Sequence, residues 1–141
     1  TGRIKHFISA FGEHVIGEEV EKAMKATLLL HPEAEVTEFT VAPFVSSEQG
    51  QSYHEWLVEF SKDPSDIKKF TTDLDHAMVG LNIYYDDLIT GNILKTLTLT
   101  PLKQGAFVDY MKTLGKLGGQ NKVPRLSNDR TFADGLLAFK K

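Results

Sequence analysis

The stretch EVTEFTVAPFVSSEQGQSYHEWLVEF, residues 35–60, decides the fold. Apolar and polar side chains alternate over residues 35–45, and the alternation is cleaner over residues 52–60. A period of two is typical of a strand with one buried face, and the polar connector SSEQGQ favours an antiparallel hairpin. The second segment places two sets of side chains on opposite faces: His54, Trp56, Val58 and Phe60 against Glu55 and Glu59.

Helical patterns border this hairpin on both sides. Before it, apolar residues recur at helical spacing from Glu18 to Leu30, and glutamates in the first turn suit the positive end of the helix dipole. After it, the sequence DPSD predicts a helix start, with Asp63 as the N-cap and Pro64 in the first helical position. The apolar stripe that follows predicts one long helix that ends near Gly91.

Shorter elements extend the pattern towards both ends. They are a strand over residues 3–8 followed by a turn or short hairpin, a strand over 95–102, a helix over 107–114 and a last helix over about 128–139. The order β-α-β-β-α-β predicts an α+β, ferredoxin-like two-layer sandwich with additional C-terminal helices. In that fold two helices cover one face of an antiparallel four-stranded sheet. We expect residues 1–141 to form a single domain.

Composition excludes several classes of protein. The 141 residues are 41% hydrophobic and 25% charged, which excludes disorder, collagen and coiled coils. The absence of cysteine excludes disulfides, thiolate metal sites and a cysteine nucleophile, and it fits a cytoplasmic location. The apolar runs are too short to span a membrane. The chain starts at Thr1 without Met, so we expect a fragment excised from a larger protein.

The charge is unevenly distributed along the chain. Residues 1–111 hold nine Lys/Arg against seventeen Asp/Glu, whereas residues 112–141 hold seven against two. A basic C-terminal segment attracts phosphate or another anion, or it is an ordinary solvated face. The net charge of −3 and the scarcity of aromatic residues among the basic ones argue against a nucleic-acid partner.

The motif GKLGGQNKVPR, residues 115–125, carries the strongest chemical signal. Gly118 and Gly119 let the backbone turn freely, and Pro124 favours an extended arm that holds Lys122 and Arg125. A compact ammonium suits an anion whose charge changes during a reaction, such as the α-phosphate of ATP. The alternative is an exposed lysine on an ordinary loop. None of the five histidines is paired at metal-binding spacing, so we expect no metal site.

The run LNIYYDDLITGNILKTLTLTPLKQGAFVDYM, together with GKLGGQNKVPR, resembles the C-terminal domain of the auxin-responsive Gretchen Hagen family of acyl acid amido synthetases. The sequence resembles bacterial members of this family more than plant members. The resemblance implies a larger enzyme of the adenylate-forming superfamily. Such an enzyme uses ATP with Mg²⁺ to convert a carboxylic acid into an acyl adenylate, and an amine, often an amino acid, then displaces AMP. This chain alone is expected to be inactive.

The resemblance also implies roles for residues of the motif. Lys122 matches the family's lysine and would stabilise negative charge on the phosphates during adenylation. Gln120 and Asn121 would fix the loop or touch the adenylate. Arg125 would support the nucleotide or instead pair with an acid of this domain, such as Asp129 or Asp134.

The N-terminal end of the chain carries weaker correspondences. His14 falls where plant members place a lysine near the nucleotide, and a turn histidine is the alternative. Gly2 and Arg3 match the segment after a hinge, about which this domain would swivel over a missing N-terminal adenylation domain. The rival hypothesis is a stand-alone binding or assembly module. An exposed apolar face around Trp56 and Phe60, without overlying helices, would favour that rival.

Overall fold

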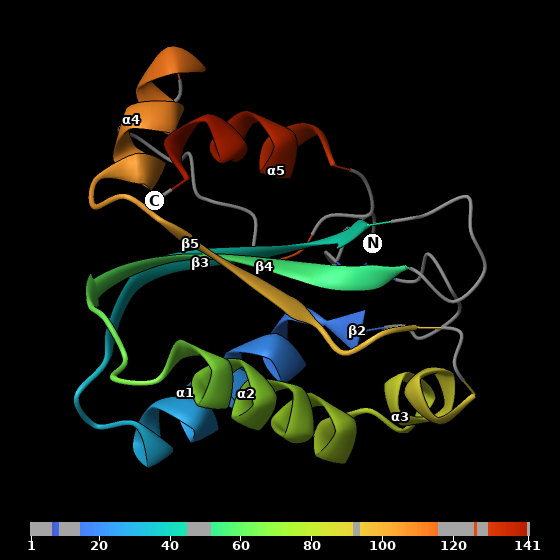
Figure 1. Ribbon diagram of the computed structural model, residues 1–141. Coiled ribbons are helices and arrows are strands. Elements are labelled where there is room, and N and C mark those ends of the chain that lie inside the picture. The colour runs from blue at the N-terminus through green and yellow to red at the C-terminus, as the bar shows by residue number, and fades with distance from the viewer. Residues whose placement is uncertain are drawn as a thin grey trace.

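The computed structural model describes residues 7–8, 15–44, 52–91, 94–115, 126 and 130–140. Its elements, in chain order, are β1 (Phe7–Ile8), β2 (Val15–Ile16), α1 (Gly17–Leu30), β3 (Glu35–Phe44), β4 (Tyr53–Lys62), α2 (Ile67–Leu81), α3 (Ile83–Thr90), β5 (Thr98–Leu102), α4 (Ala106–Thr113), α5 (Thr131–Leu136) and the 3₁₀ helix η1 (Leu137–Phe139) (Figure 1). Within these ranges no helix has the length and apolar character needed to cross a membrane.

The central sheet has the strand order β3-β4-β5. β3 and β4 form the predicted antiparallel hairpin, in a register that pairs Val41 with Trp56. β5 pairs with β4 in parallel, Leu99 opposite Trp56, and β1 pairs with β2 in a separate hairpin. The expectation of a wholly antiparallel four-stranded sheet is therefore wrong. A strand-helix-strand crossover makes β4 and β5 run the same way, and with no strand inserted between them they pair directly.

Helices cover both faces of this sheet. α1, α2 and α3 lie on one face, and α4 and α5 lie on the other (Figure 1). The predicted α+β class is confirmed, and the arrangement is consistent with a ferredoxin-like unit. The additional C-terminal helices form a third layer over the second face of the sheet. β4 is consequently buried on both sides from His54 to Phe60.

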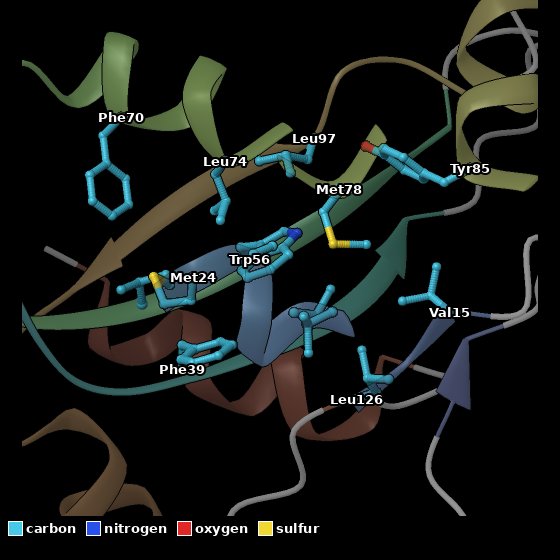
Figure 2. Packing of buried hydrophobic residues seen from close by; sticks show 14 of the residues in the cluster. Val15, Met24, Phe39, Trp56, Phe70, Leu74, Met78, Tyr85, Leu97 and Leu126 are labelled. Carbon is cyan, nitrogen blue, oxygen red and sulfur yellow. The ribbon is translucent and has the colours of Figure 1, made fainter. Parts of the chain in front are cut away.

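The larger core lies between the sheet and the layer of α1 and α2. Trp56 is completely buried, and its ring stacks on Phe39 with the centroids 5.6 Å apart. Figure 2 shows these rings among the labelled side chains Met24, Phe70, Leu74, Met78, Tyr85 and Leu97. A smaller core fills the other side of the sheet: Ala42, Leu57, Leu102, Ala106, Phe107, Ala133 and Leu136.

The predicted long helix is divided into α2 and α3 at Asn82. The backbone of Asn82 is extended, with φ −136°, and its side-chain Oδ1 accepts a hydrogen bond from the Tyr85 backbone N–H at 2.8 Å. Asn82 Nδ2 also donates to Glu19 of α1 at 2.9 Å. A single helix ending near Gly91 is therefore wrong, because asparagine stabilises a new helix start better than a helix interior.

The start of α2 also differs from the prediction. Asp66, rather than Asp63, is the N-cap, and its Oδ1 accepts from the Lys69 backbone N–H at 3.1 Å. Pro64 therefore precedes the helix instead of occupying its first position. Both aspartates are chemically suited to capping, but only Asp66 directly precedes the apolar stripe that packs on the sheet.

A buried histidine joins the end of α1 to α2. His31 Nε2 lies 2.8 Å from Asp73 Oδ2, and the imidazole ring lies 5.1 Å from the Phe70 ring. The hydrogen bond with His31 holds the pKa of Asp73 below its usual range, with a further contribution from Lys69 at 3.3 Å. The Asp73 carboxylate is thus favoured in its charged form by the folded structure.

Tyr85 fixes α3 against α2 through a buried hydrogen bond. Its hydroxyl donates to Asp75 Oδ1 at 2.6 Å, and the Leu97 backbone N–H donates to the same oxygen at 3.3 Å. Tyr85→Phe should lower the free energy of unfolding by about 1–3 kcal/mol, because it removes a donor from a buried carboxylate. Urea unfolding measures this. Tyr84→Phe, on the exposed neighbour, is the matched control, and equal effects of the two changes would refute this role for Tyr85.

The pH dependence of stability should carry a contribution from Asp73. Because its folded-state pKa lies below the unfolded value, this contribution is present above the unfolded pKa and is lost as pH falls through the folded pKa. We expect Asp73→Asn to flatten the loss of stability below roughly pH 5. Unfolding curves at several pH values measure this. Asp87→Asn, at an exposed position in α3, serves as the control, and an unchanged slope in Asp73→Asn would contradict the assignment.

Candidate functional site

The predicted site residues lie outside the described part of the chain. These are Lys122, Gln120, Asn121 and Arg125 of the motif, and His14, Gly2 and Arg3 near the N-terminus. The structure describes the residues on both sides of the motif. It therefore defines the frame of the motif, by which we mean the helices and strands to which its two ends are attached.

On its N-terminal side the motif follows α4. The helix is closed by a hydrogen bond from the Gly115 backbone N–H to the Lys112 carbonyl, at 3.0 Å. Gly115 has φ +70°, a left-handed conformation that glycine adopts without the strain other residues incur. The predicted stop of this helix at Gly115 is confirmed.

On its C-terminal side the motif is followed at once by a buried residue. Leu126 is only 1% exposed, belongs to the larger core and forms a parallel bridge with Val41 of β3. Figure 2 labels Leu126 and Val15 in this core. Arg125 thus directly precedes a fixed point on the edge of the sheet, and Lys122 lies four positions before it in the sequence.

Arg130 ties the start of α5 to the sheet. Its Nη2 donates to Glu55 Oε1 of β4 at 2.6 Å, and its Nε donates to Asp134 Oδ1 at 3.0 Å. The guanidinium also lies 5.5 Å from the centre of the Phe44 ring. Burial opposes the charge of Arg130, but the hydrogen bonds and charges of Glu55 and Asp134 outweigh it, so the pKa of Arg130 is raised. Arg130 therefore holds the start of α5 against the sheet.

The same ion pair affects neighbouring side chains. Glu55 accepts a second hydrogen bond, from the Thr100 hydroxyl of β5 at 2.5 Å. Tyr53 stacks on Phe44, with the ring centroids 4.8 Å apart. Partial burial and the nearby charge of Glu55 raise the pKa of Tyr53, and the charge of Arg130 opposes this rise. Glu55 therefore connects β4, β5 and α5 at one point.

Glu59 performs the corresponding task for α4. Its Oε2 accepts from the Gly105 backbone N–H at 2.8 Å, and its Oε1 accepts from the Phe107 backbone N–H at 3.1 Å. Gly105, the N-cap, has φ +86° and no side chain to cap the helix. A carboxylate from a different element therefore satisfies the free N–H groups and complements the helix dipole.

The sequence analysis did not identify Glu55 and Glu59 as residues that hold the helices bordering the motif. Their position opposite Trp56 was predicted correctly, but a strand face bearing two carboxylates resembles a solvent-facing one. The available signal was Leu57 on the same face, between them, together with the apolar residues of the last helices. Glu55 and Glu59 are in fact 7% and 4% exposed.

The paired charges also bear on two earlier expectations. Asp134, offered as a partner for Arg125, is bound to Arg130 one helical turn away. The basic C-terminal segment is accordingly not a uniformly solvated face, because Arg130 turns inward. Among the described residues, no group of three or more His, Asp or Glu side chains is placed to hold a metal ion.

Comparisons with known proteins identify the family and show the same fold in solved structures. Residues 18–131 match the model of the GH3 family C-terminal domain. Two solved structures share the fold, GH3.15 acyl acid amido synthetase and AtGH3.15 acyl acid amido synthetase in complex with 2,4-DB, each with a TM-score of 0.76 and 19% identity over 99% of this chain. The chain spans only 27% and 26% of those proteins. No curated protein matches it. Because the family match covers most of the sequence, the chain belongs to the GH3 family C-terminal domain.

Proposed function

We propose that this chain is the mobile C-terminal domain of an ATP-dependent acyl acid amido synthetase. The observation that carries the proposal is the family match over residues 18–131, which encloses the lysine motif. The frame supports it, because Gly115 and Leu126 attach both ends of the motif to packed structure. The coverage of about a quarter of the related chains supports a larger parent with an N-terminal adenylation domain.

The proposed reaction has two steps. The carboxylate of a small acid attacks the α-phosphorus of ATP, the bond to the β-phosphate breaks, and pyrophosphate leaves. An amine then attacks the acyl carbon of the adenylate, and the amide and AMP are released with a proton. Most of the pocket for ATP and Mg²⁺ would lie in the N-terminal domain, and Lys122 would stabilise the phosphate charge of the first step.

The remaining site residues keep subordinate roles in the proposal. Gln120 and Asn121 would support the loop or the adenylate, and Arg125 would stabilise the arm that carries Lys122. His14 would lie near the nucleotide, and the hinge would lie close to residues 2–3. A bacterial source and a cytoplasmic location stay predictions from the sequence.

The rival hypothesis of a stand-alone binding module loses its distinguishing feature. An exposed apolar face around Trp56 and Phe60, without overlying helices, would have favoured that hypothesis. Both side chains are instead buried, and they belong to the core between the sheet and the helices on that face. The described part of the sheet therefore offers no bare apolar platform at this position.

Substitution of the motif lysine tests the proposal. In the full-length parent, Lys122→Ala should lower the rate of acid-dependent pyrophosphate release from ATP by about a hundredfold, equivalent to roughly 2.7 kcal/mol of transition-state stabilisation. The measurement uses a panel of carboxylic acids. Lys112→Ala, on the exposed side of α4, is the matched control and should behave as the wild type.

Two results would count against the proposal. A parent that releases no pyrophosphate with any acid of the panel would remove the proposed activity. A parent that is active but equally affected by Lys112→Ala and Lys122→Ala would remove the specific role of Lys122.

A further inference from the structure

The junction of α2 and α3 exposes three large apolar side chains to solvent. Leu81, Ile83 and Tyr84 are 39%, 67% and 57% exposed, whereas Asn82 between them is buried. Single exposed apolar residues are common on protein surfaces, but a contiguous group of them marks an interaction surface. We call residues 81–84 the apolar corner.

The apolar corner is held rigidly although its side chains are exposed. Asn82 Oδ1 accepts from the Tyr85 backbone N–H at 2.8 Å, and Asn82 Nδ2 donates to Glu19 Oε1 of α1 at 2.9 Å. Tyr85, the next residue of α3, is completely buried and donates to Asp75. The exposed side chains therefore stand on a fixed backbone, so a partner that binds them has little backbone to order.

The apolar corner lies beside the segment by which the chain enters the domain. Glu19, which binds Asn82, is in the first turn of α1. β2 directly precedes α1 and pairs with β1, with Phe7 opposite Ile16. A protein that continues upstream of this domain is therefore joined to it close to the apolar corner.

The size of the apolar corner favours a partner that is covalently linked to it. Three such side chains supply on the order of 300 Å² of surface, whereas a stable complex of separate proteins buries about 800 Å² on each partner. A second copy of this chain would need a larger surface than this. A linked domain needs less, because the linker holds it at a high effective concentration.

The charge beside the apolar corner specifies the partner further. Asp86 and Asp87 follow it in α3, and within the described part of the chain neither forms an ion pair. Specific interfaces combine an apolar centre with a polar rim, and complementary charge on the two rims favours the correct partner. The surface that fits here is therefore apolar with a basic rim.

We propose that the apolar corner docks on the N-terminal adenylation domain of the parent, against an apolar patch with a basic rim. This inference rests on the proposed function and names the surface through which the two domains meet. This chain spans 27% of the first related structure, so the remainder is large enough to hold such a domain. A small contact of this kind also suits a mobile domain, because it is released at low cost when the domain swivels.

Hydroxyl-radical footprinting of the full-length parent, read by mass spectrometry, tests the docking. Leu30, the last residue of α1, is the internal reference, because it is aliphatic and 67% exposed, as Ile83 is. It is eleven residues from Glu19, or roughly 16 Å along the helix. In Figure 1 the end of α1 and the apolar corner lie at opposite ends of the helix layer.

The footprint is taken without ligand, with ATP and Mg²⁺, and with AMP. In at least one of these states we expect Ile83 to be oxidised at least about fivefold more slowly than Leu30, because the centre of an interface excludes water. Tyr84 should be protected in the same state.

A charged variant shows whether the protection comes from an apolar contact. Ile83→Asp should return the oxidation of Tyr84 to that of an exposed tyrosine in every state, because docking would have to desolvate a carboxylate. Leu30→Asp is the matched control and should leave the protection unchanged. Melting curves establish that both variants fold. Should Ile83→Asp fail to fold, Tyr84→Asp takes its place, with Ile83 as the readout.

Three results would overturn the docking. They are equal oxidation of Ile83 and Leu30 in all states, protection that persists in the charged variant, and protection that rises with protein concentration, which would assign the apolar corner to a second copy. The footprint requires no catalysis, so the two proposals fail separately. A parent that releases no pyrophosphate would refute the proposed function, whereas an active parent with an unprotected corner would refute the docking alone.

Discussion

The burial of β4 on both faces is the constraint on which the rest of the structure depends. On one face Trp56 and its apolar neighbours are covered by α1 and α2, which is the ordinary hydrophobic solution for a central strand. On the other face Leu57 lies between two carboxylates, Glu55 and Glu59, that have to be hydrogen-bonded once water is excluded. α4 and α5 cover that face and also supply the bonds it requires.

The two buried carboxylates fix the positions of α4 and α5 on the sheet more strictly than apolar packing alone would. Apolar contacts tolerate small shifts of one helix over another, because the hydrophobic effect is not directional. Hydrogen bonds to buried charges are directional and are expensive to leave unmade. The contacts of Glu59 with α4 and of Glu55 with Arg130 therefore define where each helix lies on the sheet. The lysine motif is joined to these two helices, which connects the fold to the proposed chemistry of a GH3 C-terminal domain.

Much of the fold was predictable because local periodicity reflects local burial. The hairpin of β3 and β4, the extent of α1 and the stop at Gly115 each depend on residues close together in the sequence, and each is confirmed. The parallel pairing of β5 and the division at Asn82 were not predicted. Both depend on tertiary packing, since Asn82 is fixed by Glu19 of α1 and β5 by its place beside β4.

The frame of the site was harder to predict for the same reason. Glu55 and Arg130 are 75 positions apart, and neither belongs to a motif. A charged residue in a strand and an arginine before a short helix are each typical of exposed positions. Only the third layer, formed by α4 and α5, brings them together and buries them. The motif lysine, in contrast, was recognisable from its sequence, and its role stays a prediction.

The coupling between Glu55 and Arg130 tests the central claim most directly. It is obtained from the unfolding free energies of the wild type, Glu55→Gln, Arg130→Gln and the double variant of this chain. The account predicts that the double variant loses at least about 1 kcal/mol less than the sum of the single losses, because each single change leaves the other group buried and without its partner. Additive losses would contradict it, and α5 would then be held to the sheet by apolar packing alone.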